Sequence, residues 1–187
     1  MDQRELVERA GRGDHDAFAV LAAAAIARLD AAARLILRDA ELTRDAVQEA
    51  LVRAWRDLPG LRDPGRFDAW LHRLTVNACL DVARRRRRRA VEVELTPIVQ
   101  PTGGDVAASI ADRDLLDRAL RGLDPEWRAV VVLHYYLGMP LPEVAGILGI
   151  PLGTAKSRLH RSIGAMRASI TGAEDAAARA VPGGQYA

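Results

Sequence analysis

The sequence predicts an all-α protein of two small helical domains that a flexible linker joins. Apolar residues recur every three to four positions through most of the chain, alanine is abundant, and aromatic residues make up only 4% of the 187 residues. This periodicity breaks in one stretch that contains several prolines and glycines. We therefore expect a first domain at residues 1–90, a linker at 91–111, a second domain at 112–170 and a disordered tail at 171–187.

Three long helices account for most of the first domain. Asp14 is the expected N-cap of a helix over 15–38, because its carboxylate can accept a hydrogen bond from a free backbone N–H. Thr43 is the expected N-cap of the next helix, at 44–58. The third helix is expected at 67–87.

The expected helix at 44–58 has an apolar face and a charged face. The apolar face consists of Val47, Leu51, Ala54, Trp55 and Leu58. The opposite face carries Asp45, Glu49, Arg53 and Arg56, with Gln48 and Val52 beside it. Because the apolar stripe is complete, the charged face is expected at the surface.

The expected helix at 67–87 leads into six consecutive arginines at 84–89. Asn77, Asp81 and Arg84 follow one flank of this helix at spacings of four and three. Six adjacent positive charges repel one another, so one interpretation is a solvated and frayed helix end. We favour a polyanionic partner, because the second half of the chain has a basic surface as well.

The second domain contains a helix-turn-helix pattern. Asp124 and Pro125 are typical of a helix start and predict a helix at 125–137. A short helix at 142–148, a turn that contains Gly149, and a longer helix at 153–169 follow.

The longer helix has a basic, hydroxyl-rich face that suits a DNA groove. Its apolar stripe is formed by Ala155, Leu159, Ile163 and Met166. The polar side carries Ser157 and Arg161, flanked by Thr154 and His160, with Lys156 and Arg167 at the edge. The alternative is an ordinary amphipathic helix, but solvated faces usually mix charges of both signs, and 153–170 contains no acid.

Composition argues against an enzyme, a membrane protein and a secreted protein. We find neither common glycine-rich phosphate loop, and His15, His72, His134 and His160 make no metal-ligand spacing with the single cysteine, so no cofactor or metal is expected. The chain offers neither an apolar run of membrane-spanning length nor a signal peptide, which indicates a cytoplasmic protein.

His72 is expected at the surface, and Tyr135 and Tyr136 are expected to pack inside the second domain.

Blocks of sequence in both halves resemble one bacterial family. The first half contains LVERAGRGDHDAF, DAVQEALVRAWRDL and FDAWLHRLTVNACLDVARRRRR, and the second contains LDPEWRAVVVLHYYLGMPLPEVAGILGIPLGTAKSRLHRS. In this order and spacing they are similar to the extracytoplasmic-function group of sigma-70 family RNA polymerase sigma factors. One departure is Pro140-Leu141-Pro142, which replaces a serine-aromatic-acid opening and removes the hydroxyl cap.

The resemblance implies a role for each domain. The first domain would grip core RNA polymerase and open the promoter −10 element, and the second would read the −35 element as duplex DNA. Docking on the clamp helices of the polymerase β′ subunit would involve Asp45, Val47, Gln48 and Glu49, to which we add Arg53 from the same face. The −10 element would contact Asn77, Arg84 and Arg85, and the −35 element would contact Thr154, Lys156, Ser157, His160 and Arg161.

Two functional alternatives accompany this interpretation. A stand-alone helix-turn-helix regulator would usually need a dimer to read two half-sites, and the chain has no heptad seam for one. It would also leave the first domain without a role. An interaction protein silenced by an inhibitory partner is compatible with the first interpretation, because that partner is commonly an anti-sigma factor in this family.

Overall fold

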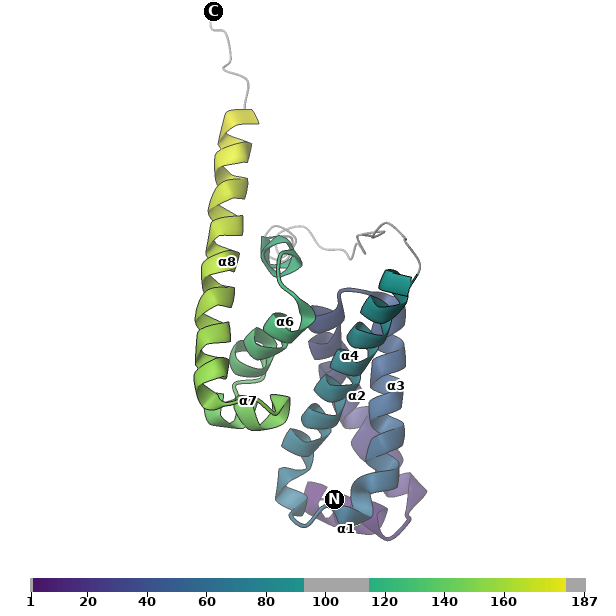
Figure 1. The fold of residues 1–187 in the computed structure, drawn as a ribbon. Coiled ribbons are helices and arrows are strands. Elements are labelled where there is room, and N and C mark those ends of the chain that lie inside the picture. Colours follow the sequence, from purple (N-terminus) through teal and green to yellow (C-terminus); the bar gives the residue numbers. More distant parts are fainter. Residues whose placement is uncertain (1, 93–114, 181–187) are drawn as a thin grey trace, which may run out of the picture.

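The computed structural model describes residues 2–92 and 115–180, and every regular element in these residues is helical (Figure 1), which confirms the all-α prediction. The front region, 2–92, comprises α1 (Gln3–Gly11), α2 (His15–Leu37), α3 (Ala40–Asp57) and α4 (Phe67–Glu92), with short 3-10 turns η1 (Leu58–Gly60) and η2 (Pro64–Arg66). The rear region, 115–180, comprises a helical segment at 115–121, α6 (Pro125–Val131), the π-helical turn η3 (Val132–Tyr136), α7 (Leu141–Leu148) and α8 (Leu152–Ala180).

The front region is a bundle in which α3 packs against both α2 and α4. Small side chains line the contacts: Ala33 on α2 and Ala46, Ala50 and Ala54 on α3 have no exposed surface. Small residues let the helix axes approach closely, although each buries little apolar area. Larger side chains, led by Phe67 and Leu71 of α4, fill the rest of this core.

Two aspartates start the long helices of the front region. Asp14 accepts a hydrogen bond from Ala17 N at 3.0 Å, which confirms it as the N-cap of α2. The prediction that Thr43 caps the next helix is wrong. Asp39 is that cap, since its Oδ1 accepts from the backbone N–H groups of Glu41 and Leu42, both at 3.0 Å. Thr43 lies buried one turn further on, where its hydroxyl donates to Asp39 O at 2.7 Å.

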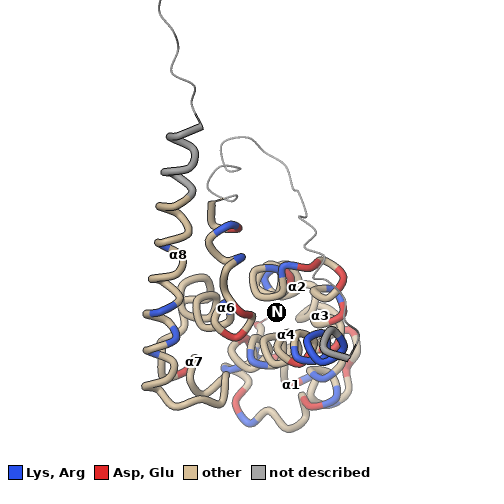
Figure 2. The backbone as a smooth tube through the Cα atoms, turned by 45° about the horizontal axis from the view of Figure 1, so that its top comes forward, with Lys and Arg blue, Asp and Glu red and all other residues tan. Residues whose placement is uncertain are grey.

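The arginine run is part of a helix, because α4 continues to Glu92. The side chains of 84–89 are all exposed, and the end of α4 carries the positive charge visible in Figure 2. Aspartates stabilise part of the run: Arg86 Nη1 donates to Asp39 Oδ2 at 2.7 Å, and Arg84 pairs with Asp81 at 3.2 Å. Apart from Val91 and Glu92, the expected linker at 91–111 lies outside the described residues.

The helix expected at 125–137 changes character at Val132, where the π-helical turn begins. Leu137 N donates to Val132 O, and the chain then turns at Gly138, whose φ is 68°. Tyr135 and Tyr136 are 63% and 48% exposed on this turn, so the expectation that they pack inside is wrong.

The helix-turn-helix is formed by α7 and α8. Pro140 precedes α7 and makes no side-chain cap, as expected for a residue without a hydroxyl group. Gly149 ends the helix in the left-handed conformation, with a φ of 63°. α8 then begins at Leu152 and continues past Ile170 to Ala180, through alanine-rich sequence that favours a helix. Residues 181–187 of the expected tail lie outside the described residues.

The two regions pack against each other. α6 and η3 contact α2, while α6 and α7 contact α4, so the rear helices lie beside the bundle as Figure 1 shows. One continuous cluster of buried residues includes the α2 and α4 cores together with Val130, Leu133, Val144 and Ile147. The sequence analysis did not anticipate this apolar contact between the regions.

The Asp39 cap can be tested by substitution. Asp39→Ala should lower the free energy of unfolding by about 1 kcal/mol, the usual cost of a lost N-cap. Asp39→Asn should cost less, because the amide oxygen can still accept from the two N–H groups. Glu41→Ala removes an exposed acid from the same first turn and is the control. Chemical denaturation followed by circular dichroism measures all three, and equal losses for Asp39→Ala and Glu41→Ala would contradict the cap.

The same substitution should have a pH dependence. Burial opposes ionisation of Asp39, but hydrogen bonds from Leu42 N and the Arg86 side chain outweigh it and lower the pKa of this carboxyl group. A carboxylate with a lowered pKa stabilises the fold above its ordinary pKa, and this stabilisation is lost as the pH falls. The difference between wild type and Asp39→Ala should therefore shrink in acid.

Candidate nucleic-acid and protein interface

The charged face of α3 is exposed as expected. Asp45, Gln48 and Glu49 all lie at the surface, whereas Val47 is 6% exposed and belongs to the core. Arg53 is half-buried, because its guanidinium lies between two carboxylates: Nε donates to Glu49 at 2.8 Å and Nη1 donates to Asp81 at 3.4 Å. The hydrogen bond to Glu49 is the main cause that raises the pKa of Arg53. Arg53 is therefore occupied within the protein, whereas Asp45 forms no ion pair with any residue that the structure describes.

An apolar groove of about 750 Å³ lies next to this face, between α2 and α3. Its lining includes Phe18, Ile26, Leu51, Val52 and Trp55, and its polar edge includes Gln48, Arg44 and Asp30. Val52 is 59% exposed and Ile26 is 46% exposed, which is unusual for large aliphatic side chains on neighbouring helices. The sequence showed Val52 on the polar face, but the groove depends on how α2 packs against α3.

The α4 residues predicted for the −10 element share one side of the helix. Asn77 and Arg84 are seven residues apart, which places them two turns from each other on the same stripe. Asn77 is half-buried, and its side chain makes no hydrogen bond with any described residue. Arg84 and Arg85 are exposed, and Arg85 forms no ion pair within the described part of the chain.

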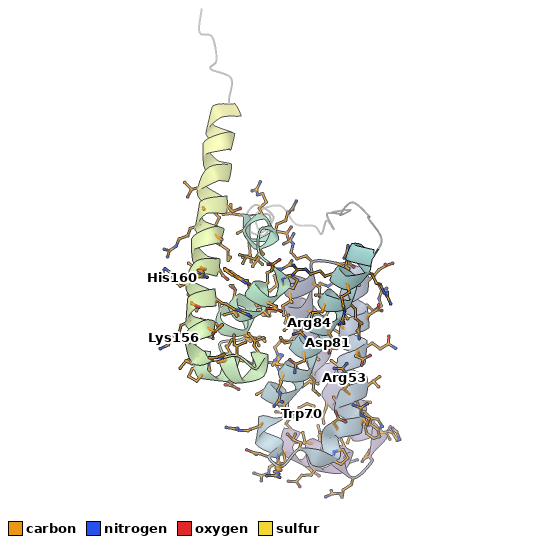
Figure 3. All side chains as sticks on the ribbon, viewed as in Figure 1. Arg53, Trp70, Asp81, Arg84, Lys156 and His160 are labelled. Carbon is orange, nitrogen blue, oxygen red and sulfur yellow. The ribbon has the colours of Figure 1, made fainter. Side chains whose placement is uncertain are left out.

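A series of ion pairs connects α3, α4, α6 and α8. Beyond Arg53 and Asp81, Arg84 Nη1 lies 3.2 Å from Asp81 Oδ1, and Arg84 Nε lies 4.0 Å from Glu126 Oε1 on α6. The other oxygen of Glu126 lies 3.2 Å from Arg158 Nη1 on α8. Figure 3 shows Arg53, Asp81 and Arg84 in succession. Each exposed pair contributes little stability alone, so the main consequence is that Glu126 connects the front and rear regions.

The polar face of α8 points away from the front region. Lys156, Ser157, His160 and Arg161 are exposed, Thr154 is half-buried, and the labelled Lys156 and His160 lie on the outer side of α8 in Figure 3. Ser157 Oγ donates to Thr154 O at 3.1 Å. Ala155 on the opposite side is completely buried. The structure therefore brings together the five residues predicted for the −35 element.

Comparison with known proteins identifies the family of both regions. Family models match twice: Sigma-70 region 2 at residues 22–89, and Sigma-70, region 4, at residues 113–166. ECF RNA polymerase sigma factor SigM of Mycobacterium tuberculosis is 36% identical over 160 residues, which cover 84% of this chain and 79% of SigM. The RNA polymerase sigma-E factor of Streptomyces avermitilis is 36% identical over 72% of this chain and 74% of its own length.

The chain belongs to the ECF RNA polymerase sigma factors. It is an alternative sigma factor and not a stand-alone helix-turn-helix regulator, because both sigma regions are present in order. A further relative, ECF sigma factor SigE of Mycolicibacterium smegmatis, is 37% identical over 63% of this chain, and the chain spans about half of its length, 47%.

Two solved structures have the same fold as this sigma factor. CnrH, in complex with the cytosolic domain of CnrY, is 30% identical and superposes with a TM-score of 0.62 over 89% of this chain and 95% of CnrH. The sigma factor RpoE of Bartonella quintana, in complex with the anti-sigma factor NepR, is 22% identical and has a TM-score of 0.65 over 82% of this chain and 96% of RpoE.

Two charged residues of the rear and front regions were missed by the sequence analysis. Arg38 ends α2 in the left-handed conformation, with a φ of 58°, and its side chain donates to Asp117 O at 2.7 Å and Asp117 Oδ2 at 2.6 Å. Arg128 on α6 is only 8% exposed, and its Nε has no acceptor among the described residues. Burial, followed by the nearby charge of Arg38, lowers the pKa of Arg128 to about 10.

Two other groups of this sigma factor lie in the core. His72 is 6% exposed, so the expectation of a surface position is wrong; burial and then the charge of Arg28 lower its pKa. Burial raises the pKa of Cys79 to about 12, which keeps this thiol protonated and unreactive at neutral pH. Within 2–92 and 115–180, every helix is too short or too polar to span a bilayer.

Proposed function

We propose that this sigma factor docks on core RNA polymerase through α3, engages the −10 element through α4 and reads the −35 element through α8. The observation that carries the proposal is the position of three polar surfaces, each on a helix within a matched sigma region and each opposite a buried apolar stripe. The proposal places the protein in the cytoplasm, with promoter DNA as its ligand, and assigns it no enzymatic step and no cofactor.

An anti-sigma factor is a second proposed partner. RpoE was solved in complex with the anti-sigma factor NepR, and CnrH with the cytosolic domain of CnrY. Both share the fold of this chain, and these complexes support an anti-sigma factor as a regulator of this sigma factor.

For polymerase docking, α3 offers charge and apolar surface side by side. Asp45 and Glu49 are exposed acids, and the groove lined by Val52 and Trp55 begins next to Gln48. A helix from the partner that presents basic and apolar side chains on one face would satisfy both surfaces. We therefore assign Asp45, Gln48 and Glu49 to the charged part of the β′ contact, while Arg53 positions Glu49 through their hydrogen bond.

Reversing both charges, Asp45→Lys with Glu49→Lys, should weaken binding of core polymerase by about 2–5 kcal/mol, as expected for charges that lose desolvated partners. The matched control is Glu41→Lys with Asp57→Lys, which reverses two other acids of α3. Glu41 has no ion pair within the described part of the chain, and Asp57 is paired with Arg56. Association with purified core polymerase can be measured by fluorescence anisotropy and checked by run-off transcription.

The groove can be tested separately with Val52→Asp, which introduces a charge at a side chain that is already exposed. Val20→Asp is the control, because Val20 is similarly exposed, at 54%, but lies outside this groove. Polymerase binding should fall only for Val52→Asp. If the charge reversal and Val52→Asp both bind like wild type, the docking assignment is wrong.

For the −35 element, Arg161→Ala should cost about 1–3 kcal/mol and relax preference at one base pair, as expected for an arginine that contacts a base edge. Arg167→Ala, nearer the end of the face, should weaken all sequences alike and reduce the salt slope by about one, as expected for a phosphate contact. Binding of polymerase holoenzyme to promoters with single −35 substitutions measures both. A uniform loss for Arg161→Ala would contradict base reading.

Asn77 is proposed to hold an unpaired base of the −10 element. Its amide offers a donor and an acceptor, it makes no hydrogen bond with described residues, and Arg84 on the same stripe can hold a nearby phosphate. Opening a base pair costs a few kcal/mol, which a protein pocket for the flipped base offsets. The alternative, a purely structural asparagine, would leave base preference unchanged.

Asn77→Ala should reduce open-complex formation by holoenzyme on duplex promoter DNA. Premelted promoter DNA removes the opening cost but keeps the base contact, so a defect at one −10 position should persist there. The readout is binding of holoenzyme to premelted promoters in which each −10 base is varied in turn. If Asn77→Ala retains the wild-type ranking of bases at every position, Asn77 is structural.

A further inference from the structure

We propose that this sigma factor has a binding site for a small inorganic oxyanion, with phosphate as the representative ion, where α6 packs against the end of α2. The main ligand would be the guanidinium group of Arg128 on α6, and Arg38 at the end of α2 would add positive charge beside it. Neither residue takes part in the proposed contacts with polymerase or promoter DNA.

Arg128 is a buried charge without a partner. Only 8% of its surface is exposed, and its Nε is completely buried. A guanidinium group carries five N–H donors, yet Arg128 forms neither a hydrogen bond nor an ion pair with any described residue. Buried polar groups are nearly always paired in folded proteins, so an unpaired one indicates a bound ion or a water molecule.

Loss of a proton does not remove this buried charge. Burial, followed by the charge of Arg38, lowers the pKa of Arg128 to about 10. The group is therefore still protonated at neutral pH. Asp124 and Asp117 favour the protonated form, but they outweigh neither burial nor Arg38. A buried cation that keeps its proton needs compensation from an anion or from water.

The charged side chains around Arg128 leave an excess of positive charge. The carboxylate of Asp117 is already occupied, because Arg38 donates to its Oδ2 at 2.6 Å and Arg121 Nη2 lies 3.3 Å from the same oxygen. Asp124 is exposed and forms no ion pair within the described part of the chain. Three arginines and two aspartates leave one positive charge uncompensated, which matches the binding of one anion.

The chemistry of the free donors favours an oxyanion over chloride. The planar guanidinium group donates two parallel hydrogen bonds to two oxygens of the same phosphate or carboxylate. Access is narrow, since Arg128 is 8% exposed and the side chain of Arg38 is 15% exposed. A small free ion can enter such a site more easily than a carboxylate of a partner protein or the phosphate of a nucleotide. We therefore assign a free inorganic oxyanion to this site.

The arginine run at 84–89 offers a different kind of phosphate contact. Its side chains are all exposed, so water can hydrate them and salt can screen them. These residues also attract phosphate, with less dependence on the identity of the ion. A test of the buried site must therefore compare variants at Arg128 with controls that leave residues 84–89 unchanged.

Titration of the full chain with inorganic phosphate, followed by calorimetry at constant ionic strength, tests the site directly. Wild type should show one saturable site. Arg128→Met keeps an unbranched side chain but removes the donors, so it should weaken binding by about tenfold or more, as expected for lost hydrogen bonds to a charged group. Arg118→Met is the control, because Arg118 is an exposed arginine without an ion pair to any described residue.

Two results of this titration would overturn the site. One is the same phosphate affinity for wild type and Arg128→Met. The other is absence of a saturable site in wild type, which would mean that water alone compensates Arg128. Loss of binding in Arg128→Met but not in Arg118→Met would support the site. Run-off transcription by wild type tests the proposed function separately, so the two can fail independently.

Thermal unfolding gives a second measurement and shows that the variant is folded. An ion that binds only the folded chain stabilises it in proportion to the logarithm of its concentration above the Kd. Without phosphate, Arg128→Met should be at least as stable as wild type, because an apolar side chain often replaces a buried charge without loss. Phosphate should raise the melting temperature of wild type more than that of Arg128→Met. Equal increases would reflect the general effect of phosphate salts and would overturn the site.

A third variant should strengthen binding. Asp117→Asn removes a negative charge near Arg128, while the amide oxygen can still accept a hydrogen bond from Arg38. Phosphate should therefore bind this variant several-fold more tightly than wild type. Glu143→Gln is the control, because it removes an exposed acid of α7 that forms no ion pair with a described residue. Equal strengthening in both variants would show an effect of net charge and would overturn the role of this cluster.

Adenosine monophosphate distinguishes a free ion from a nucleotide. It presents a phosphate group attached to a much larger molecule. Its binding at constant ionic strength should be weaker than that of inorganic phosphate and equal in wild type and Arg128→Met. If its binding falls in Arg128→Met as strongly as the binding of phosphate does, the assignment to a free inorganic ion is wrong.

Discussion

Helix α4 is buried on two opposite sides, and the rest of the structure depends on this constraint. Leu71 and Leu80 are nine residues apart, which places them on opposite sides of α4, yet only 1% and 5% of their surfaces are exposed. A helix covered twice has only a narrow polar stripe left, and that stripe carries Asn77 and Arg84. The rear region packs against α4 through α6 and α7, and Glu126 of α6 lies near Arg84 of α4.

The charged residues of the proposed interfaces are arranged as a connected set and not as isolated contacts. Glu49, on the polymerase face, orients Arg53, and Arg53 reaches Asp81, which in turn holds Arg84. Each pair is largely solvated and contributes little stability. Their role is positional, because they fix Arg53 between Glu49 on α3 and Asp81 on α4. Asp81 therefore links the α3 face proposed to bind polymerase with the α4 residues proposed to bind the −10 element.

The helices and exposed faces were predictable from the sequence because they depend on local periodicity, whereas several caps and burials depend on tertiary packing. Asp14 follows directly after a glycine, which leaves one choice of cap, but Asp39 and Thr43 are both good N-cap residues one turn apart. Arg38 adopts a left-handed conformation that glycine or asparagine usually takes, so no local sequence feature indicated this conformation. The surface position predicted for His72 was wrong because α4 is buried over more of its circumference than a single apolar stripe covers. The apolar residues Val76 and Leu80, which lie outside the predicted stripe, were the sequence signal for this wider burial.

The two DNA-reading surfaces also differ in how strongly they depend on the packing of the regions. The α8 face is complete within the helix-turn-helix, since Ala155 and Ser162 on its inner side are fully buried by the rear region itself and its polar side chains need nothing from α4. The α4 stripe is different, because its arginines are shared between aspartates of the front region and Glu126 of the rear. The phosphate backbone of promoter DNA offers the same kind of acceptor, so the proposed −10 contact would replace one of these carboxylates at Arg84. Arg84 is thus the residue at which the packing of the two regions and the proposed −10 contact meet, because each involves an acceptor for its guanidinium.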